Sequence, residues 1–199
     1  ASRDVTERRE YERQLEEVGA TLRVQQDRLL DANSRLEALA SLDSLTGLKN
    51  RRAFEERLHE EIARARRSQE PFALLLLDID HFKNFNDSFG HPRGDDVLKS
   101  VARVLSRSVR DADFIARYGG EEFAIILPDT DRDGAKLMGE RLRVAIEENA
   151  WDVRPITMSV GAAAWTDAST AESLVDQADR ALYRSKQAGR NIVTLAEAA

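Results

Sequence analysis

The sequence that decides the fold has two glycines near its start and an apolar run at its end: Arg117-Tyr118-Gly119-Gly120-Glu121-Glu122-Phe123-Ala124-Ile125-Ile126-Leu127. Two glycines between two extended runs predict a tight hairpin turn, because glycine accepts the positive φ angles that two-residue turns need. The turn leads directly into two adjacent carboxylates, Glu121 and Glu122. We expect the bare glycines to leave room for a large ligand and the carboxylates to attract a hard cation. The alternative is an ordinary hairpin with acidic residues at its tip.

A second acidic group follows a run of apolar residues. Residues 72–77 are apolar throughout and have the length of a strand, so we predict a central strand that is buried on both faces. This strand ends in Asp78, Ile79 and Asp80. Burying an acid is costly unless it is paired or binds a metal. The two aspartates are two residues apart, so we expect both on the same face of the strand.

Composition limits the classes of function. The chain has 199 residues and a net charge of -6, which fits one domain with an appendage and argues against a nucleic-acid binder held by bulk charge. It has no cysteine, which excludes disulfides, thiolate metal sites and cysteine nucleophiles. No apolar run is long enough to cross a membrane, and no secretion signal opens the chain, so we expect a cytoplasmic protein without membrane insertion. Because the chain begins without Met, we also expect a fragment of a longer protein.

The N-terminal segment has a heptad pattern, with leucine at each a position. It predicts a coiled coil over residues 1–41 that joins two copies of the chain as a homodimer. The polar Gln25 lies on the seam, where it fixes the register at some cost in stability. An amphipathic helix folded back on its own domain is the alternative. The seam comprises Tyr11, Leu15, Val18, Leu22, Gln25, Leu29, Ala32, Leu36 and Leu39.

The remaining residues, 42–199, predict one domain in which strands and helices alternate. We predict helices over residues 50–68, 82–88, 93–108, 133–149 and 170–188, the last ended by Gly189 as its C-cap. Predicted strands cover residues 72–80, 113–118, 122–127, 156–163 and 192–195. This order favours an α+β fold with one layer of helices on a mixed or antiparallel sheet.

Several ordered motifs together resemble the GGDEF family, the diguanylate cyclases that condense two GTP molecules into cyclic di-GMP. The resemblance covers residues 42 to about 193 and implies a palm-like, ferredoxin-related fold. The first few residues of the chain, 3–8, also resemble the end of a PAS sensor domain, which implies an upstream sensor domain. The motifs are Asp43-Ser44-Leu45-Thr46-Gly47-Leu48 with Asn50-Arg51-Arg52, Asp78-Ile79-Asp80-His81-Phe82-Lys83, Asn86-Asp87, Gly90-His91 with Gly94-Asp95, Gly119 to Phe123, and Lys186 with Gly189-Arg190-Asn191.

The resemblance implies a metal-dependent catalytic corner. Attack of a ribose 3′-hydroxyl on the α-phosphate of a second GTP calls for divalent cations, Mg²⁺ or Mn²⁺, two in each active site. By resemblance, Asp78, Glu121 and the backbone carbonyl of Ile79 bind metal, and Glu122 lies at the attacking hydroxyl or the second metal. Gly119 and Gly120 belong to the same catalytic motif. For Asp78, the alternative is a helix N-cap.

The resemblance also implies the substrate contacts. Backbone N–H groups at Phe82 and Lys83, the start of a helix, bind phosphate together with the Lys83 side chain. Lys186 and Arg190 match the distal phosphate contacts, although surface cations are their ordinary interpretation. Asn86 and Asp95 occupy the guanine-recognition positions; the alternatives are a turn residue for Asn86 and a helix N-cap for Asp95.

A short Arg-x-x-Asp motif precedes the hairpin. Arg110 and Asp113 match the inhibitory site at which the family binds its product, cyclic di-GMP, and Arg141 completes that site from a neighbouring domain. A surface salt bridge between Arg110 and Asp113 is the alternative. Two other functions remain open: a catalytically silent receptor for nucleotide or product, and a coiled-coil dimerisation module with a passive domain.

Overall fold

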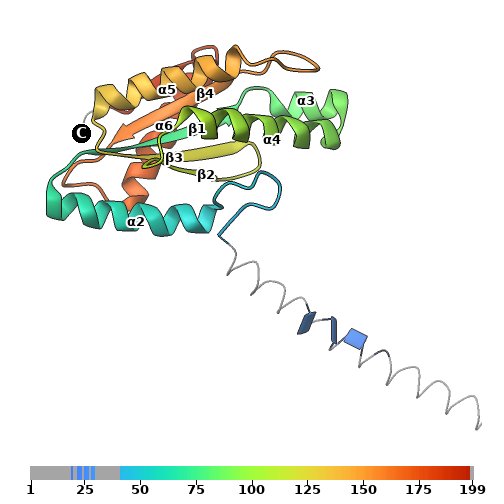
Figure 1. Cartoon of the computed structure of the whole chain (residues 1–199), viewed down its shortest axis with the longest axis horizontal. Helices are drawn as coiled ribbons and strands as arrows, with labels where there is room; N and C mark the ends of the chain where they lie inside the picture. The colour runs from blue at the N-terminus through green and yellow to red at the C-terminus, as the bar shows by residue number, and fades with distance from the viewer. Residues whose placement is uncertain (1–18, 20–21, 24, 27, 30–40, 198–199) are drawn as a thin grey trace, which may run out of the picture. The chain divides into compact units, whose positions relative to one another are not determined.

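The structure is a computed structural model that describes residues 19, 22–23, 25–26, 28–29 and 41–197 (Figure 1). The chain divides into two units, Ala1–Ala40 and Ser41–Ala199. The described residues of the first unit are helical, and Leu22 and Leu29 are exposed in the single chain. The rest of the predicted coiled coil and the segment that resembles a PAS domain lie outside the described residues. No helix in the described part is long and apolar enough to cross a bilayer.

The second unit is built on a mixed five-stranded sheet, in the order β2-β3-β1-β4-β5. Neighbouring strands are antiparallel except β4 and β5, which are parallel. The predicted α+β fold is confirmed. The strands are β1 (Phe72–Ile79), β2 (Phe114–Arg117), β3 (Glu122–Pro128), β4 (Met158–Ala164) and β5 (Val193–Leu195).

Helices cover both faces of this sheet (Figure 1). On one face, Leu75 and Leu77 pack in a core with α3, α4 and α5; on the other, Leu74 and Leu76 pack with α2 and α6. The prediction of a single helix layer was wrong, because a strand that is apolar at every position needs cover on both faces. The helices are α2 (Arg51–Ser68), α3 (Phe82–Phe89), α4 (His91–Ser108), α5 (Arg132–Glu147) and α6 (Ala171–Gln187).

Element ends differ from the predictions by at most two residues. Helix α4 begins at His91 rather than at residue 93, with Pro92 in its first turn, where the missing N–H of proline costs nothing. The C-cap of α6 is Ala188 rather than Gly189. Gly189 follows it with a φ of 119°, so glycine is still needed to leave the helix.

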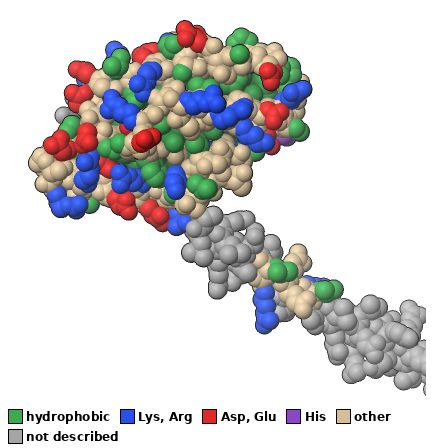
Figure 2. All heavy atoms as spheres, in the orientation of Figure 1, with side chains coloured by type: hydrophobic (Ala, Val, Ile, Leu, Met, Phe, Trp, Pro, Cys, Tyr) green, Lys and Arg blue, Asp and Glu red, His purple; other side chains and the backbone are tan. Residues whose placement is uncertain are grey.

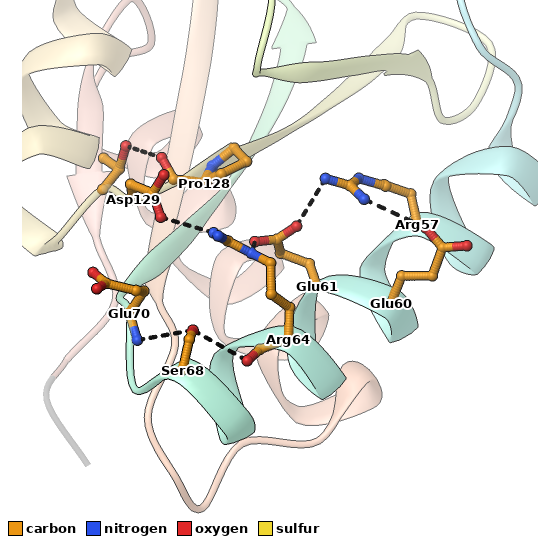
Figure 3. Close-up of polar contacts among 9 residues, drawn as sticks. Arg57, Glu60, Glu61, Arg64, Ser68, Glu70, Pro128 and Asp129 are labelled. Atoms are coloured by element: carbon orange, nitrogen blue, oxygen red, sulfur yellow. Dashed lines mark hydrogen bonds and ion pairs between the residues drawn. The ribbon is translucent and has the colours of Figure 1, made fainter.

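Ion pairs around a buried acid of α2 extend through Arg64 to the residue after β3 (Figure 3). The Glu61 side chain is fully buried, and Arg64 Nε donates to its Oε1 across 2.6 Å. Arg57 Nη2 lies 2.9 Å from Glu61 Oε2 in an ion pair without hydrogen-bond geometry. Arg64 also donates to Asp129, directly after β3, at 2.8 Å. Removing Glu61 would leave two arginines without their buried partner, so this contact fixes the helix that begins the domain.

Candidate active site

The end of β1 brings the predicted catalytic acids together. In the sheet register, Asp78 lies opposite Glu122 of β3 on one side and Ser159 of β4 on the other. The next residue, Ile79, donates its N–H to the carbonyl of Glu121 at 3.3 Å. The carboxylates of Asp78, Glu121 and Glu122 therefore lie at the same end of the central strand.

Asp78 carries its charge in an unfavourable place. Its exposed fraction is 7%, and burial raises its pKa from 3.8 to about 6, with Glu121 and Glu122 adding to the rise. Lys186, from α6, opposes that rise, since its Nζ lies 2.8 Å from Asp78 Oδ2. A buried carboxylate beside two others is stabilised by a nearby positive charge, and in this structure the Lys186 ammonium supplies that charge.

The residue types at this corner fit a hard divalent cation. Carboxylate and carbonyl oxygens are the ligands that Mg²⁺ and Mn²⁺ prefer. Among residues 41–197 no group of three or more acidic or histidine side chains is arranged to hold a metal ion. In this metal-free arrangement Asp78 is instead paired with the Lys186 ammonium. The N-cap interpretation of Asp78 is wrong, because His81 is the N-cap of α3.

Replacing Asp78 with asparagine should stabilise the metal-free protein at neutral pH. Because burial raises the pKa of Asp78 to about 6, its contribution to the free energy of unfolding is complete near pH 4 and is lost as the pH rises through about 6. We expect Asp78→Asn to melt several degrees above the wild type at about pH 7 and no higher at about pH 4. Thermal melts with a chelator present test this, and equal melting temperatures at neutral pH would contradict it.

The glycine pair does not work as predicted. Neither Gly119 nor Gly120 has a positive φ, so their conformational freedom does not explain the turn. Gly119 lies close to the Glu122 side chain, since a Cβ there would lie 2.5 Å from Glu122 Oε2 and the carboxylate would have to move aside. A Cβ on Gly120 would meet nothing within 4 Å. The Glu122 carboxylate therefore lies beside the backbone of Gly119, in space that a side chain there would occupy.

Arg117 holds this turn, a role that sequence reasoning missed. Its guanidinium donates to the carbonyl of Gly120 from Nε at 3.1 Å and from Nη2 at 2.8 Å. Its Nη1 also donates to both oxygens of Asp43, at 3.2 and 3.1 Å. Asp43 in turn accepts from the backbone N–H of Thr46 at 2.8 Å. The first loop of the domain is therefore tied to the acidic hairpin through one arginine.

The predicted phosphate contacts come from the start of α3, the end of α6 and the turn after α6. Helix α3 begins at Phe82 without a side-chain cap, which leaves first-turn N–H groups for an anion. Lys83 is exposed on that turn, and Lys186 contacts Asp78. Arg190 lies in the turn after α6 with a φ of 65°.

The two predicted guanine contacts lie next to each other. Asn86 Oδ1 is buried without a hydrogen-bond partner in the described part of the chain, so it is available as an acceptor for a ligand. A Cβ on Gly94 would lie 1.9 Å from that oxygen, so a larger residue there would displace the Asn86 side chain. Asp95 is the next residue. It is not the N-cap of α4, which is Gly90.

Two of the three predicted inhibitory residues, Arg110 and Arg141, line a separate hollow of about 670 Å³. Leu137 and Met138 form its apolar part. Arg141 donates to the carbonyl of Ser108 in the same chain, and its approach to a second domain stays a prediction. Arg110 and Asp113 form no salt bridge among the described residues. Asp113 instead accepts from the backbone N–H of Arg110 at 2.8 Å, which shapes the loop and leaves the guanidinium free.

The sequence model of the family described as "Diguanylate cyclase, GGDEF domain" matches residues 40–192. The chain is 46% identical to diguanylate cyclase DgcP of Pseudomonas aeruginosa over 161 residues, which are 79% of this chain and 24% of that protein. It is 41% identical to diguanylate cyclase A of Treponema denticola over 83% of this chain and 47% of that protein. It thus spans a quarter to a half of these relatives.

Solved structures agree with the sequence matches. The GGDEF domain of DgcB from Caulobacter crescentus, solved in complex with c-di-GMP, superposes with a TM-score of 0.77 at 41% identity. That match covers 80% of this chain and 97% of that one. A structure of the coiled coil and GGDEF domain of the same protein covers 92% of this chain, with 37% identity and a TM-score of 0.77.

Proposed function

Because the chain belongs to the family of GGDEF diguanylate cyclase domains, we propose that it condenses two molecules of GTP into cyclic di-GMP. In each half of the reaction a ribose 3′-oxygen bonds to the α-phosphorus of the other nucleotide. The bond from that phosphorus to pyrophosphate breaks, so two pyrophosphates leave. The observation that carries the proposal is the buried Asp78, which lies beside Glu122 and is compensated by the Lys186 ammonium.

Each group at the corner has a part in this proposal. A divalent cation, Mg²⁺ or Mn²⁺, bound by Asp78, Glu121 and the carbonyl of Ile79, supplies Lewis-acid activation of the phosphate. Glu122, whose carboxylate lies close to Gly119, accepts the proton of the attacking hydroxyl in this proposal. Lys186 is released from Asp78 when the metal binds and then faces the phosphates.

The substrate is recognised at both of its ends. The N–H groups at the start of α3 and the side chains of Lys83 and Arg190 hold the triphosphate. The buried oxygen of Asn86 accepts from the guanine amine, and Asp95 accepts from guanine N1–H. Adenine has an acceptor at N1, so it would leave Asp95 facing a lone pair.

One domain holds one GTP, so the reaction needs two copies of the chain. We propose that the N-terminal coiled coil supplies the second copy. Leu22 and Leu29 are helical, lie seven residues apart and are 59% and 71% exposed in the single chain. Such apolar residues at a heptad spacing are buried when two helices pair. The upstream sensor domain and the cytoplasmic location stay predictions.

Incubation with GTP and Mg²⁺, followed by chromatography of the products, tests the activity directly. We expect cyclic di-GMP and pyrophosphate in a ratio of one to two. The alternative, a silent receptor, is favoured only by the separate hollow at Arg110 and Arg141. Binding of cyclic di-GMP without any turnover would support that alternative and reject the enzyme.

Replacing Arg110 with alanine should relieve inhibition by the product. The guanidinium is exposed at the hollow and is not bound by Asp113, so it is available for paired contacts with guanine or phosphate. We expect Arg110→Ala to weaken inhibition by added cyclic di-GMP at least about tenfold, the effect of losing one charged hydrogen-bond pair. Initial rates measured against cyclic di-GMP concentration give the inhibition constant.

The matched control is Arg107→Ala. Arg107 is an exposed arginine one turn earlier in α4 that does not line the hollow. It should leave the inhibition constant unchanged. Equal inhibition of the Arg110 variant and the wild type would return Arg110 to an ordinary surface residue.

A further inference from the structure

Asp80, the residue directly after β1, has hydrogen bonds to both of its carboxylate oxygens, although it takes no part in the proposed chemistry. Asp80 is 5% exposed, and both of its carboxylate oxygens accept hydrogen bonds. Oδ1 accepts from the hydroxyl of Ser159 at 2.7 Å. Oδ2 accepts from the hydroxyl of Thr157 at 2.7 Å and from the backbone N–H of Asn191 at 3.0 Å. Thr157 directly precedes β4 and Ser159 is its second residue, whereas Asn191 is 111 residues away from Asp80.

The segment that Asp80 contacts through Asn191 has an unfavourable backbone. Gly189, Arg190 and Asn191 have φ angles of 119°, 65° and 50°, three left-handed residues in succession. Only glycine takes up such angles without cost, so the other two need support from their surroundings. The turn begins at the end of α6 and leads into β5.

Asn191 is the residue at which this turn is held. Its side-chain oxygen accepts from Arg143 Nη1 at 2.9 Å, and its side-chain amide donates to Glu147 Oε1 at 2.8 Å. Those two contacts come from α5. The third contact, from the backbone N–H of Asn191 to Asp80 Oδ2, links the turn to the residue directly after β1, at the catalytic corner.

The two acids at the end of β1 therefore contact two points of one C-terminal segment. Asp78 contacts Lys186 at the end of α6, and Asp80 contacts Asn191, five residues later. Arg190 lies between those two points. Its side chain is exposed and makes no hydrogen bond or ion pair within residues 41–197, so only its backbone is fixed.

We propose that Asp80 is a positioning residue that sets the place of Arg190 relative to the catalytic corner, acting through the backbone N–H of Asn191. The proposal rests on the proposed function, in which Arg190 binds the triphosphate. It explains why an acid that touches neither metal nor nucleotide occupies a buried position two residues beyond Asp78.

The mechanism requires an acceptor at Oδ2 rather than a charge. An asparagine at this position can direct its carbonyl oxygen to the Asn191 N–H and its amide to the Ser159 hydroxyl, which is able to accept. Alanine offers nothing to the N–H. The two substitutions therefore separate hydrogen bonding from charge.

The test is a double-mutant cycle with Arg190. We expect Asp80→Ala to raise the KM for GTP about tenfold with kcat changed less than about threefold, and Asp80→Asn to stay within about twofold of wild type. In an Arg190→Ala background, Asp80→Ala should add less than about twofold to KM, because the cation it positions is already absent. The matched control Thr157→Val removes another hydrogen bond to Oδ2 without touching Asn191 and should leave KM unchanged.

Calorimetry gives a second readout that does not depend on turnover. The probe is a GTP analogue with a methylene group in place of the oxygen between its α- and β-phosphates. Its affinity should fall about tenfold in Asp80→Ala and not in Asp80→Asn. If Asp80→Ala does not fold, as judged by circular dichroism, Asp80→Ser leaves a polar group and room for water beside the hydroxyls and takes its place in both measurements.

Three results would overturn the proposal: an unchanged affinity in Asp80→Ala, equal losses in the alanine and asparagine variants, or an undiminished effect in the Arg190→Ala background. Equal losses would mean that the charge of Asp80 matters in itself. Failure of the proposed function has a different signature, since wild-type protein would form no cyclic di-GMP while the analogue affinities would still report on Asp80.

Discussion

Replacing Asp78 with asparagine or Glu121 with glutamine is expected to lower the rate of cyclic di-GMP formation at least about a thousandfold, equivalent to roughly 4 kcal/mol of transition-state stabilisation. Each change removes one metal-binding charge and preserves the size of the side chain. For Asp78 the loss of activity should accompany a gain in stability, since the pKa of about 6 shows that its charge is disfavoured in the metal-free fold. A site that is costly to the fold and necessary for turnover is typical of catalytic groups.

Initial rates with saturating GTP and Mg²⁺ measure the loss, and circular dichroism verifies the fold. Asp80→Asn is the matched control, since it changes a second buried acid two residues along the chain, directly after the same strand. We expect that variant to retain its activity. Wild-type turnover in either Asp78→Asn or Glu121→Gln would reject the assignment of the catalytic corner.

The catalytic strand could be predicted from the sequence because its signals are local. Residues 72–77 are apolar without alternation, and an acid follows them directly. The same run also contained the evidence against a single layer of helices, because a strand without a polar face has to be covered twice. The helices and strands were therefore predicted correctly, because the spacing of apolar residues along the chain distinguishes the two.

The roles of individual residues depended on contacts that no local pattern contains. Asp80 meets Asn191 across 111 residues, and Arg117 meets Asp43 across 74. Gly119 was predicted for the right place and the wrong reason, since its φ is not positive and its missing side chain leaves room for the Glu122 carboxylate. A motif can identify such residues, but only the folded structure shows which atoms each of them contacts.

The remaining prediction concerns how two active sites are brought together. Replacing both Leu22 and Leu29 with lysine places like charges across the seam of the proposed coiled coil. Each large apolar residue lost from a core costs about 2 to 5 kcal/mol, enough to separate a dimer of modest affinity. We expect the double variant to be a monomer in light scattering, with a specific activity that is low in dilute solution and rises steeply with protein concentration.

This concentration dependence follows from the chemistry, because one domain holds only one of the two GTP molecules that react. The matched control is Ala20→Lys with Asp27→Lys, which adds two lysines with the same spacing at the heptad position farthest from the seam. It should remain dimeric and active at every concentration. If the leucine variant were also dimeric and fully active when dilute, the second copy would have to be supplied by the catalytic domains themselves, and the N-terminal helix would have no part in bringing the two sites together.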